Sequence, residues 1–223
     1  MHASPNTRSA SASHCVFPMF GIIGASPKIT LAQADEAMAL ADEYGFTFFQ
    51  SWARFSRGWA LAELGQLAQG MVEMEVAIAN LHRVGGSPDL RYAIALVANG
   101  YARMRQTERA LPVLDEALER IEHTGEKLDQ AELLRLKGEV LLMSDGSATA
   151  PAEKCFREAL EVSRAQEGKW WELRTTVSLA RVLRDTDRFD EAQTMLAEIY
   201  NWFNEGFDTA DLKKAKRCST NSA

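Results

Sequence analysis

The sequence predicts an all-α protein, a right-handed solenoid of about four helix-hairpin units plus a leading half-unit. A nine-residue pattern recurs with copies that begin at Gly70, Ala110, Ala152 and Ala192, and small residues recur twelve to fourteen positions before each copy. Glycines follow most of the expected second helices. The chain has 223 residues, of which 46% are hydrophobic, so it is long enough to bury a core without disulfides or a metal.

The recurring pattern defines one face of the second helix in each unit. Spacings of four, seven and eight residues put its apolar positions on one side of a helix, so we expect them in the core. The copies are GMVEMEVAI (70–78), ALPVLDEAL (110–118), AEKCFREAL (152–160) and AQTMLAEIY (192–200). Their large apolar residues are Met74, Leu114, Phe156 and Leu196.

The first helix of each unit carries a small residue followed, three positions on, by a large one. The small residues are Gly58, Ala98, Gly138 and Ala180. Two helices per unit, with small residues where backbones approach, is the pattern of tetratricopeptide (TPR) repeats, although their usual period is about 34 residues and the period here is longer. Left-handed caps are expected at the glycines that follow the second helices, namely Gly45, Gly85, Gly125, Gly168 and Gly206.

The N-terminal part reads as an incomplete unit. Ala32–Tyr44 lies one repeat period before the next second helix and lacks a first helix of its own. We expect residues 1–28 to be a disordered or loosely packed tail, 29–217 to be the repeat domain and 218–223 to be a disordered tail. The apolar stretch Cys15–Ala25 could alternatively be a signal-peptide core, but it contains Pro18 and follows no positive cluster. A half-unit without its first helix would leave an apolar face uncovered, and two copies of the chain could associate through that face.

The C-terminal stretch Trp171–Lys216 carries the motifs WELR, SLARVLRD and EGFDTADLKKAK. With these motifs it resembles the end of the TPR region in bacterial multidomain signalling proteins. In that family a class III adenylate/guanylate cyclase or another effector precedes a P-loop ATPase module, and a TPR array follows. The resemblance covers roughly residues 29–216 and omits the cyclase and ATPase segments. It implies a sensor or regulatory scaffold, or alternatively a truncated or split part of an enzyme whose catalytic modules are encoded elsewhere.

Composition and motifs predict no enzyme and no catalytic residue, cofactor or metal. The segment Gly21–Lys28 departs from a Walker A loop because Pro27 stands where that loop needs a glycine. His82 and His123 fall near expected helix ends, where a cation is favourable, which is a simpler interpretation than a metal pair. Cys155 is expected to pack beside Phe156 rather than to react.

The charge and cysteine content restrict the partners and the compartment. A formal net charge of −6 leaves no surplus of Lys and Arg for a nucleic-acid partner. Three widely spaced cysteines suit a reducing compartment, so we expect a cytoplasmic protein. No apolar run approaches the ~20 residues that cross a bilayer, so we expect no membrane partner.

The first helices of TPR arrays line a groove, and the repeat register gives its candidate residues here. The candidates are Trp52, Phe55, Trp59, Tyr92, Asn99, Arg103, Arg135, Arg174, Arg181 and Arg184. Aromatic residues at one end and arginines at the other predict a protein or peptide partner that is acidic with an apolar anchor. The alternative is that Trp52, Phe55 and Trp59 belong to the core.

Overall fold

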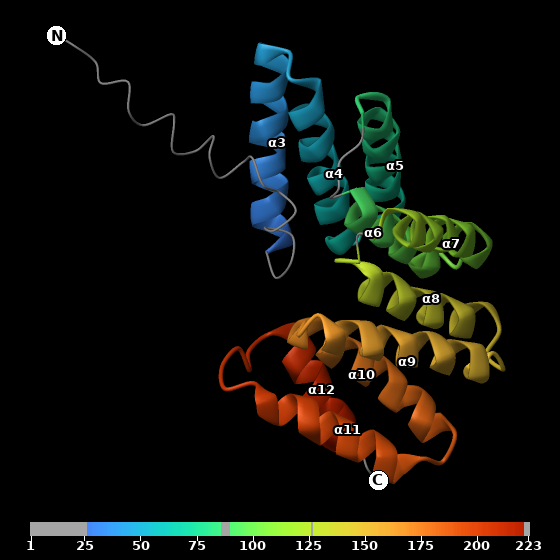
Figure 1. Cartoon of the computed structure of the whole chain (residues 1–223). Coiled ribbons are helices and arrows are strands. Elements are labelled where there is room, and N and C mark those ends of the chain that lie inside the picture. The colour runs from blue at the N-terminus through green and yellow to red at the C-terminus, as the bar shows by residue number, and fades with distance from the viewer. Residues whose placement is uncertain (1–25, 86–89, 126, 221–223) are drawn as a thin grey trace. The chain divides into compact units, whose positions relative to one another are not determined.

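The computed structural model describes residues 26–85, 90–125 and 127–220, in which every regular element is an α-helix (Figure 1). The all-α class expected from the sequence is therefore confirmed for this part of the chain. The helices fall into two compact units, which divide between Met104 and Arg105. This boundary lies inside the second expected repeat, so each unit is described by itself. Expectations for residues 1–25 and 221–223 lie outside the described residues.

The first unit contains α3 (Pro27–Tyr44), α4 (Thr47–Glu63), α5 (Leu67–Arg83) and α6 (Leu90–Arg103). Helix α4 packs against both α3 and α5, and α6 packs against α5. Pro27 begins α3 because its ring fixes a helical φ and its missing N–H needs no partner at a helix start. The helix thus begins shortly before the expected domain start at Ile29.

Helices α4 and α5 touch through two glycines. A Cβ atom on Gly58 would lie 2.6 Å from the carbonyl oxygen of Gly70, closer than side chains approach in folded proteins. Across the same interface Glu73 Oε2 accepts a hydrogen bond from Arg54 Nε at 2.6 Å, and Glu73 Oε1 accepts one from Arg57 Nη1 at 3.2 Å. The expected role of Gly58 as a point of close helix approach is confirmed.

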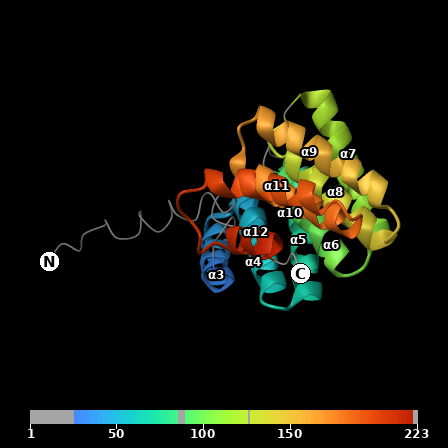
Figure 2. The same cartoon turned by 90° about the horizontal axis from the view of Figure 1, so that it is seen from below.

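Over its described residues, 105–125 and 127–220, the second unit has six helices, which are labelled in Figures 1 and 2. They are α7 (Thr107–Thr124), α8 (Gln130–Ser144), α9 (Thr149–Ala165), α10 (Lys169–Asp185), α11 (Phe189–Trp202) and α12 (Ala210–Thr220). Helices α8 and α9 form one hairpin and α10 and α11 another, while α12 packs against α10 and α11. Leu212 and Ala215 of α12 are buried in this core, and the helix extends through Thr220, past the expected start of a tail at residue 218.

The core confirms the repeat register of the second helices. Met74, Leu114, Phe156 and Leu196 are all buried, at 2% exposure or less. The small residues of the first helices lie against this face: a Cβ atom on Gly138 would lie 2.5 Å from Cε1 of Phe156, and Ala180 is buried in the core of the second unit. The period that recurs in the sequence therefore also describes the packing of the second helices.

The turns after the helices use glycine in most of the expected places. Gly45 and Gly125 have φ values of 69° and 72° and end α3 and α7 in the left-handed conformation. The turn after α9 differs, because Glu167 takes a φ of 55° and Gly168, with φ −79°, precedes the first residue of α10. The expected left-handed cap at Gly168 is therefore wrong, and the strained position falls on the preceding residue.

Candidate partner-binding surfaces

Three aromatic candidates for the groove belong to the core of the first unit. Phe55 has no exposed surface, and Trp52 and Tyr92 are each 6% exposed. The rings of Trp52 and Phe55 meet edge to face with centroids 5.9 Å apart. Since a buried side chain cannot contact a partner, the prediction of these three as groove contacts is corrected to a core role. Trp59 and Asn99 are half-buried and remain available.

Arg103 lies at the exposed end of α6 and is engaged within the first unit. Its guanidinium forms an ion pair with Glu63 of α4, and Nη2 donates to the carbonyl oxygen of Ala62 at 3.1 Å. This arginine therefore links α6 to α4 as well as facing solvent.

Arg135 is buried in the second unit rather than displayed in a groove. Its Nε and Nη2 atoms donate to the two carboxylate oxygens of Glu132 at 2.7 and 2.9 Å. Burial alone would lower the pKa of Arg135, but the carboxylates of Glu132, Glu139 and Asp211 together outweigh burial and raise it. Burial likewise would raise the pKa of Glu132, but Arg135 and Arg174 hold it below its ordinary value. Both side chains are therefore charged, and Arg135 has a structural role.

The other arginine candidates of the second unit also meet partners within the unit. Arg174 Nη2 lies 3.0 Å from Glu132 Oε1, and Arg181 pairs with Glu139 of α8. Arg184 Nη1 donates to the carbonyl oxygen of Cys218 at 3.3 Å. The structure thus brings the predicted arginines onto neighbouring helices but places carboxylates between them. The expected basic end of the groove is largely neutralised.

An exposed aromatic cluster, missed at the sequence level, lies where α3 turns into α4. It comprises Tyr44, Phe46, Phe48 and Phe49, which are 63%, 54%, 36% and 43% exposed. Neighbouring rings in the cluster have centroids 5.5 to 6.1 Å apart. The signal in the sequence is the run YGFTFF, whose aromatics are nearly consecutive and so cannot all lie on one buried helix face.

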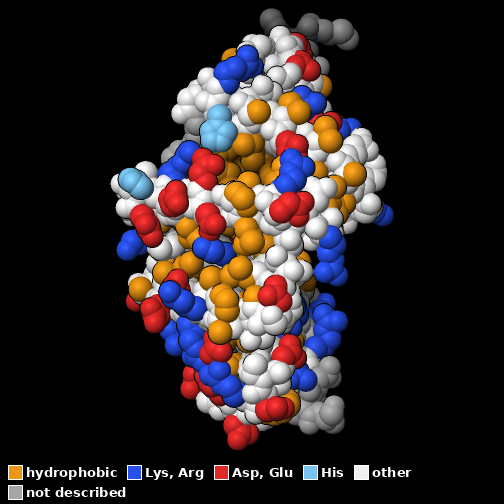
Figure 3. Space-filling view, turned by 90° about the vertical axis from the view of Figure 1, so that its right-hand side faces the viewer, with side chains coloured by type: hydrophobic (Ala, Val, Ile, Leu, Met, Phe, Trp, Pro, Cys, Tyr) orange, Lys and Arg blue, Asp and Glu red, His pale blue; other side chains and the backbone are white. Residues whose placement is uncertain are grey.

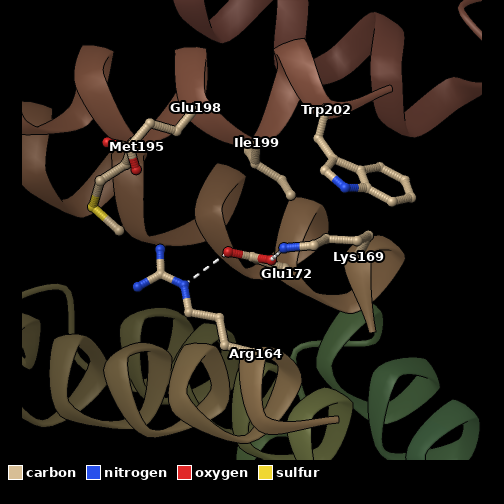
Figure 4. A pocket seen from close by; sticks show the side chains of 7 residues that line it. All are labelled: Arg164, Lys169, Glu172, Met195, Glu198, Ile199 and Trp202. Carbon is tan, nitrogen blue, oxygen red and sulfur yellow. Dashed lines mark hydrogen bonds and ion pairs between the residues drawn. The ribbon is translucent and has the colours of Figure 1, made fainter. Parts of the chain in front are cut away.

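A pocket of about 300 Å³ opens between α9, α10 and α11 of the second unit (Figure 4). We call it the α9–α11 pocket. It is lined by Arg164, Lys169, Glu172, Met195, Glu198, Ile199 and Trp202. Glu172 precedes Arg174 by two residues, about 200° around a helix, so the pocket and the groove candidates lie on opposite sides of α10. A search confined to groove positions could not find it.

A buried carboxylate organises the charges of the α9–α11 pocket. The side chain of Glu172 is 7% exposed and accepts hydrogen bonds from Arg164 Nε at 2.7 Å and Lys169 Nζ at 2.8 Å. Burial would raise the pKa of Glu172, but Lys169 and Arg164 hold it below its ordinary value. The Lys169 ammonium lies 5.9 Å from the centre of the exposed Trp202 ring, within reach of a cation–π contact.

The remaining candidates from the sequence have structural explanations. His82 and His123 lie in the last turns of α5 and α7, as expected, and His123 Nδ1 lies 2.7 Å from the carbonyl oxygen of Glu119. Burial raises the pKa of the Cys155 thiol, which disfavours the reactive thiolate. Among the described residues no group of three His, Cys, Asp or Glu side chains could hold a metal ion.

The visible surface carries both signs of charge. On the face shown in Figure 3, Lys and Arg side chains are interspersed with Asp and Glu. In the second unit, ion pairs also join neighbouring elements: Arg188 Nη1, at the start of α11, lies 2.9 Å from Glu153 Oε2 of α9. No helix in the described part of the chain combines the length and apolar character needed to span a membrane.

The fold and its packed helix pairs define a TPR-like helical-repeat protein. No protein-family model matches the sequence, and no curated protein matches it significantly. Among solved structures, the chain is similar to Bacillus thuringiensis PlcR, crystallised with the peptide PapR7 and DNA, with 12% identity and a TM-score of 0.76. That match covers 97% of this chain and 76% of PlcR. The chain is also similar to TPR-like repeats of a Podospora anserina kinesin light chain protein, with 13% identity, a TM-score of 0.60 and coverage of 97% and 100%.

Proposed function

We propose that this chain is a non-catalytic TPR-like scaffold that binds a protein or peptide partner. The aromatic cluster at the α3–α4 turn carries the proposal. Contiguous exposed apolar side chains are uncommon on monomeric proteins and mark interaction surfaces. Phe46 and Phe49 stand more than two-fifths exposed while contacting each other, so the cluster presents a prearranged apolar face without further ordering.

The similarity in fold supports a peptide or protein partner. PlcR, which shares the TPR-like fold, was crystallised with a peptide and with DNA. The acidic net charge of −6 disfavours DNA as the partner of this chain, so of the two kinds of PlcR partner we propose only a peptide here. The motifs in Trp171–Lys216 support a role as the sensor or regulatory end of a bacterial signalling ATPase or cyclase in the cytoplasm.

The second candidate function is a contribution to an enzyme, as a split or truncated part of a cyclase or ATPase. The same motifs in Trp171–Lys216 favour it, since they resemble a region that accompanies those modules. The two candidates differ in the activity of the isolated chain. The scaffold proposal expects that the purified protein neither hydrolyses ATP nor makes cyclic AMP. Turnover that survives removal of contaminating enzymes would favour the enzyme.

A capture experiment with a matched aromatic control tests the scaffold. The intact chain and the Phe46→Ser, Phe49→Ser double variant are immobilised, and the bound proteins are identified by mass spectrometry. Phe189→Ser is the control, because Phe189 is 50% exposed but lies on α11, outside the cluster. We expect the double variant to lose specific partners that the control retains. Identical capture by all three proteins would refute the cluster as the docking surface.

A further inference from the structure

The α9–α11 pocket has hydrogen-bonding capacity that is chiefly of the donor kind. Both oxygens of Glu172 already accept hydrogen bonds, one from Arg164 and one from Lys169. Arg164 uses only Nε, and its terminal nitrogens have no polar partner among the described residues. In Figure 4 these nitrogens point away from Glu172 towards the side of the pocket where Met195 lies. A ligand group bound beside Arg164 and Lys169 must therefore accept hydrogen bonds.

Apart from Glu198, the rest of the lining is apolar. Ile199 is 4% exposed and forms part of the core of the second unit, against which Met195 also packs. The Trp202 ring is 59% exposed and stands beside the Lys169 ammonium (Figure 4). A volume of about 300 Å³ is at the lower end of ligand pockets, so it accommodates one residue-sized group rather than a large cofactor.

We propose that the α9–α11 pocket binds a carboxylate borne next to a branched apolar group, presented by a segment of the protein partner. The terminal nitrogens of Arg164 bind the carboxylate in bidentate fashion, and Lys169 supplies a further donor. The apolar group packs on Met195 and the Trp202 ring. The inference rests on the proposed scaffold function and adds a contact in the second unit to the aromatic cluster in the first.

Two features favour an anion over a cation in this pocket. A cation bound beside Arg164 and Lys169 would need a free carboxylate there, but Glu172 is already engaged by both side chains. Glu198 is the other carboxylate of the lining, and it is exposed, so solvent and salt screen its repulsion of an anion. Because Glu172 fixes Arg164 and Lys169 before the ligand arrives, little ordering of these side chains opposes binding.

Binding of small probes tests the chemistry of the site. N-acetyl-leucine carries the carboxylate and the branched group, N-acetyl-leucinamide lacks the charge, and leucinamide carries a positive charge instead. Each is titrated into the intact chain while the indole N–H resonance of Trp202 is followed, with Trp202→Phe used to assign it. We expect N-acetyl-leucine to bind with a Kd on the order of millimolar, as fits so small a ligand, and the amide to bind roughly ten-fold more weakly.

Three variants locate the interaction. Arg164→Gln should weaken N-acetyl-leucine binding roughly ten-fold, since a charge-assisted contact is lost. Arg120→Gln is the matched control, an exposed arginine of α7 that should leave binding unchanged. Glu198→Gln should tighten binding a few-fold, because it removes a repulsive charge. Unchanged melting temperatures confirm that the variants are folded.

Several results would overturn the proposal. It fails if acid and amide bind equally, if leucinamide binds best, or if neither acid nor amide shifts the Trp202 resonance at roughly 10 mM. It also fails if Arg164→Gln captures the same partners as the unmodified chain while the probe still loses affinity, since the ligand would then be a small molecule. Capture by the Phe46→Ser, Phe49→Ser double variant tests the scaffold proposal separately. The scaffold proposal and the pocket proposal can therefore fail independently of each other.

Discussion

Replacing Gly58 by alanine should destabilise the first unit, although alanine is the better helix former. The new Cβ atom would lie 2.6 Å from the Gly70 oxygen and 2.9 Å from both Glu73 Cβ and Met74 Cγ. Ordinary contacts begin at 3.4 Å, so α4 and α5 must separate by most of an ångström. The first two of these neighbours are a backbone atom and a Cβ atom, and neither can rotate away.

The magnitude follows from two opposing effects. Overpacking costs roughly 1–3 kcal/mol, and the upper end applies where backbone must move. The better helix propensity of alanine returns about 1 kcal/mol. The net loss is about 2 kcal/mol, which for a chain of this length lowers the melting temperature by roughly 4–8 °C. Thermal unfolding followed by circular dichroism measures this shift.

Gly146→Ala is the matched control, because a Cβ atom there would meet no atom within 4 Å. It should change the melting temperature little, as surface substitutions usually fall within about 0.5 kcal/mol. Gly100→Ala is an intermediate case, since its close neighbour is the flexible thioether of Met71. If Gly58→Ala and Gly146→Ala melt alike, the close approach of α4 and α5 through Gly58 is wrong.

Three further predictions concern the second unit. Glu132→Gln should cost roughly 3 kcal/mol in urea unfolding, because the buried Arg135 loses its bidentate partner and keeps only the longer contact with Glu139, at 3.4 Å, as an ion pair. The lowered pKa of Glu132 means that its contribution is complete above its unfolded value of 4.5 and is lost as pH falls below it, so the variant should show a weaker acid dependence of stability. Charge reversal at Arg181 and Arg184 together should weaken capture of the partner and also lower the melting temperature, because Glu139 would face a carboxylate in place of Arg181 and keep only its longer contact with Arg135. Gly138→Leu should lower the melting temperature by several degrees, as added atoms meet the buried Phe156 ring.

The sequence was sufficient to predict the core of the repeats. A helix face buried in every unit must repeat with the unit, so Leu114 and Phe156 could be identified from spacing alone. The aromatic residues Trp52 and Phe55 were assigned to a groove on the same register, yet they are buried. Register fixes which side of a helix a residue occupies, but burial depends on how closely the neighbouring helix approaches. Gly58 and Gly70 bring α4 and α5 together, and only the structure shows how far.

The two surfaces on which our proposals rest could not be found from a repeat pattern. The aromatic cluster lies in a turn, and turns are not constrained by the helix period. The α9–α11 pocket is assembled from the end of α9, the beginning of α10 and the end of α11. Arg164 and Trp202 line it together although the whole of α10 lies between them in the sequence. Such a site follows from the three-dimensional course of the chain, and its residues share no motif.

The arginines show how charge on a repeat surface should be interpreted. Glu63 pairs with Arg103 across a sequence separation of 40, and Glu139 pairs with Arg181 across a separation of 42. Glu132 pairs with Arg174 in the same way. These separations equal the spacings of the small residues in the same first helices, 40 between Gly58 and Ala98 and 42 between Gly138 and Ala180. Each pair therefore joins equivalent positions of the first helices in successive units.

Equivalent positions in successive units of a solenoid face the same side and lie one repeat apart, where long side chains can meet. Opposite charges at such positions therefore neutralise each other, and counting arginines along one face overstates its positive charge. The useful quantity is the charge that remains after residues one period apart have been paired. By that measure the pairs at 132/174 and 139/181 hold α8 and α10 together, and recognition of a partner falls to side chains with unused donors or exposed rings.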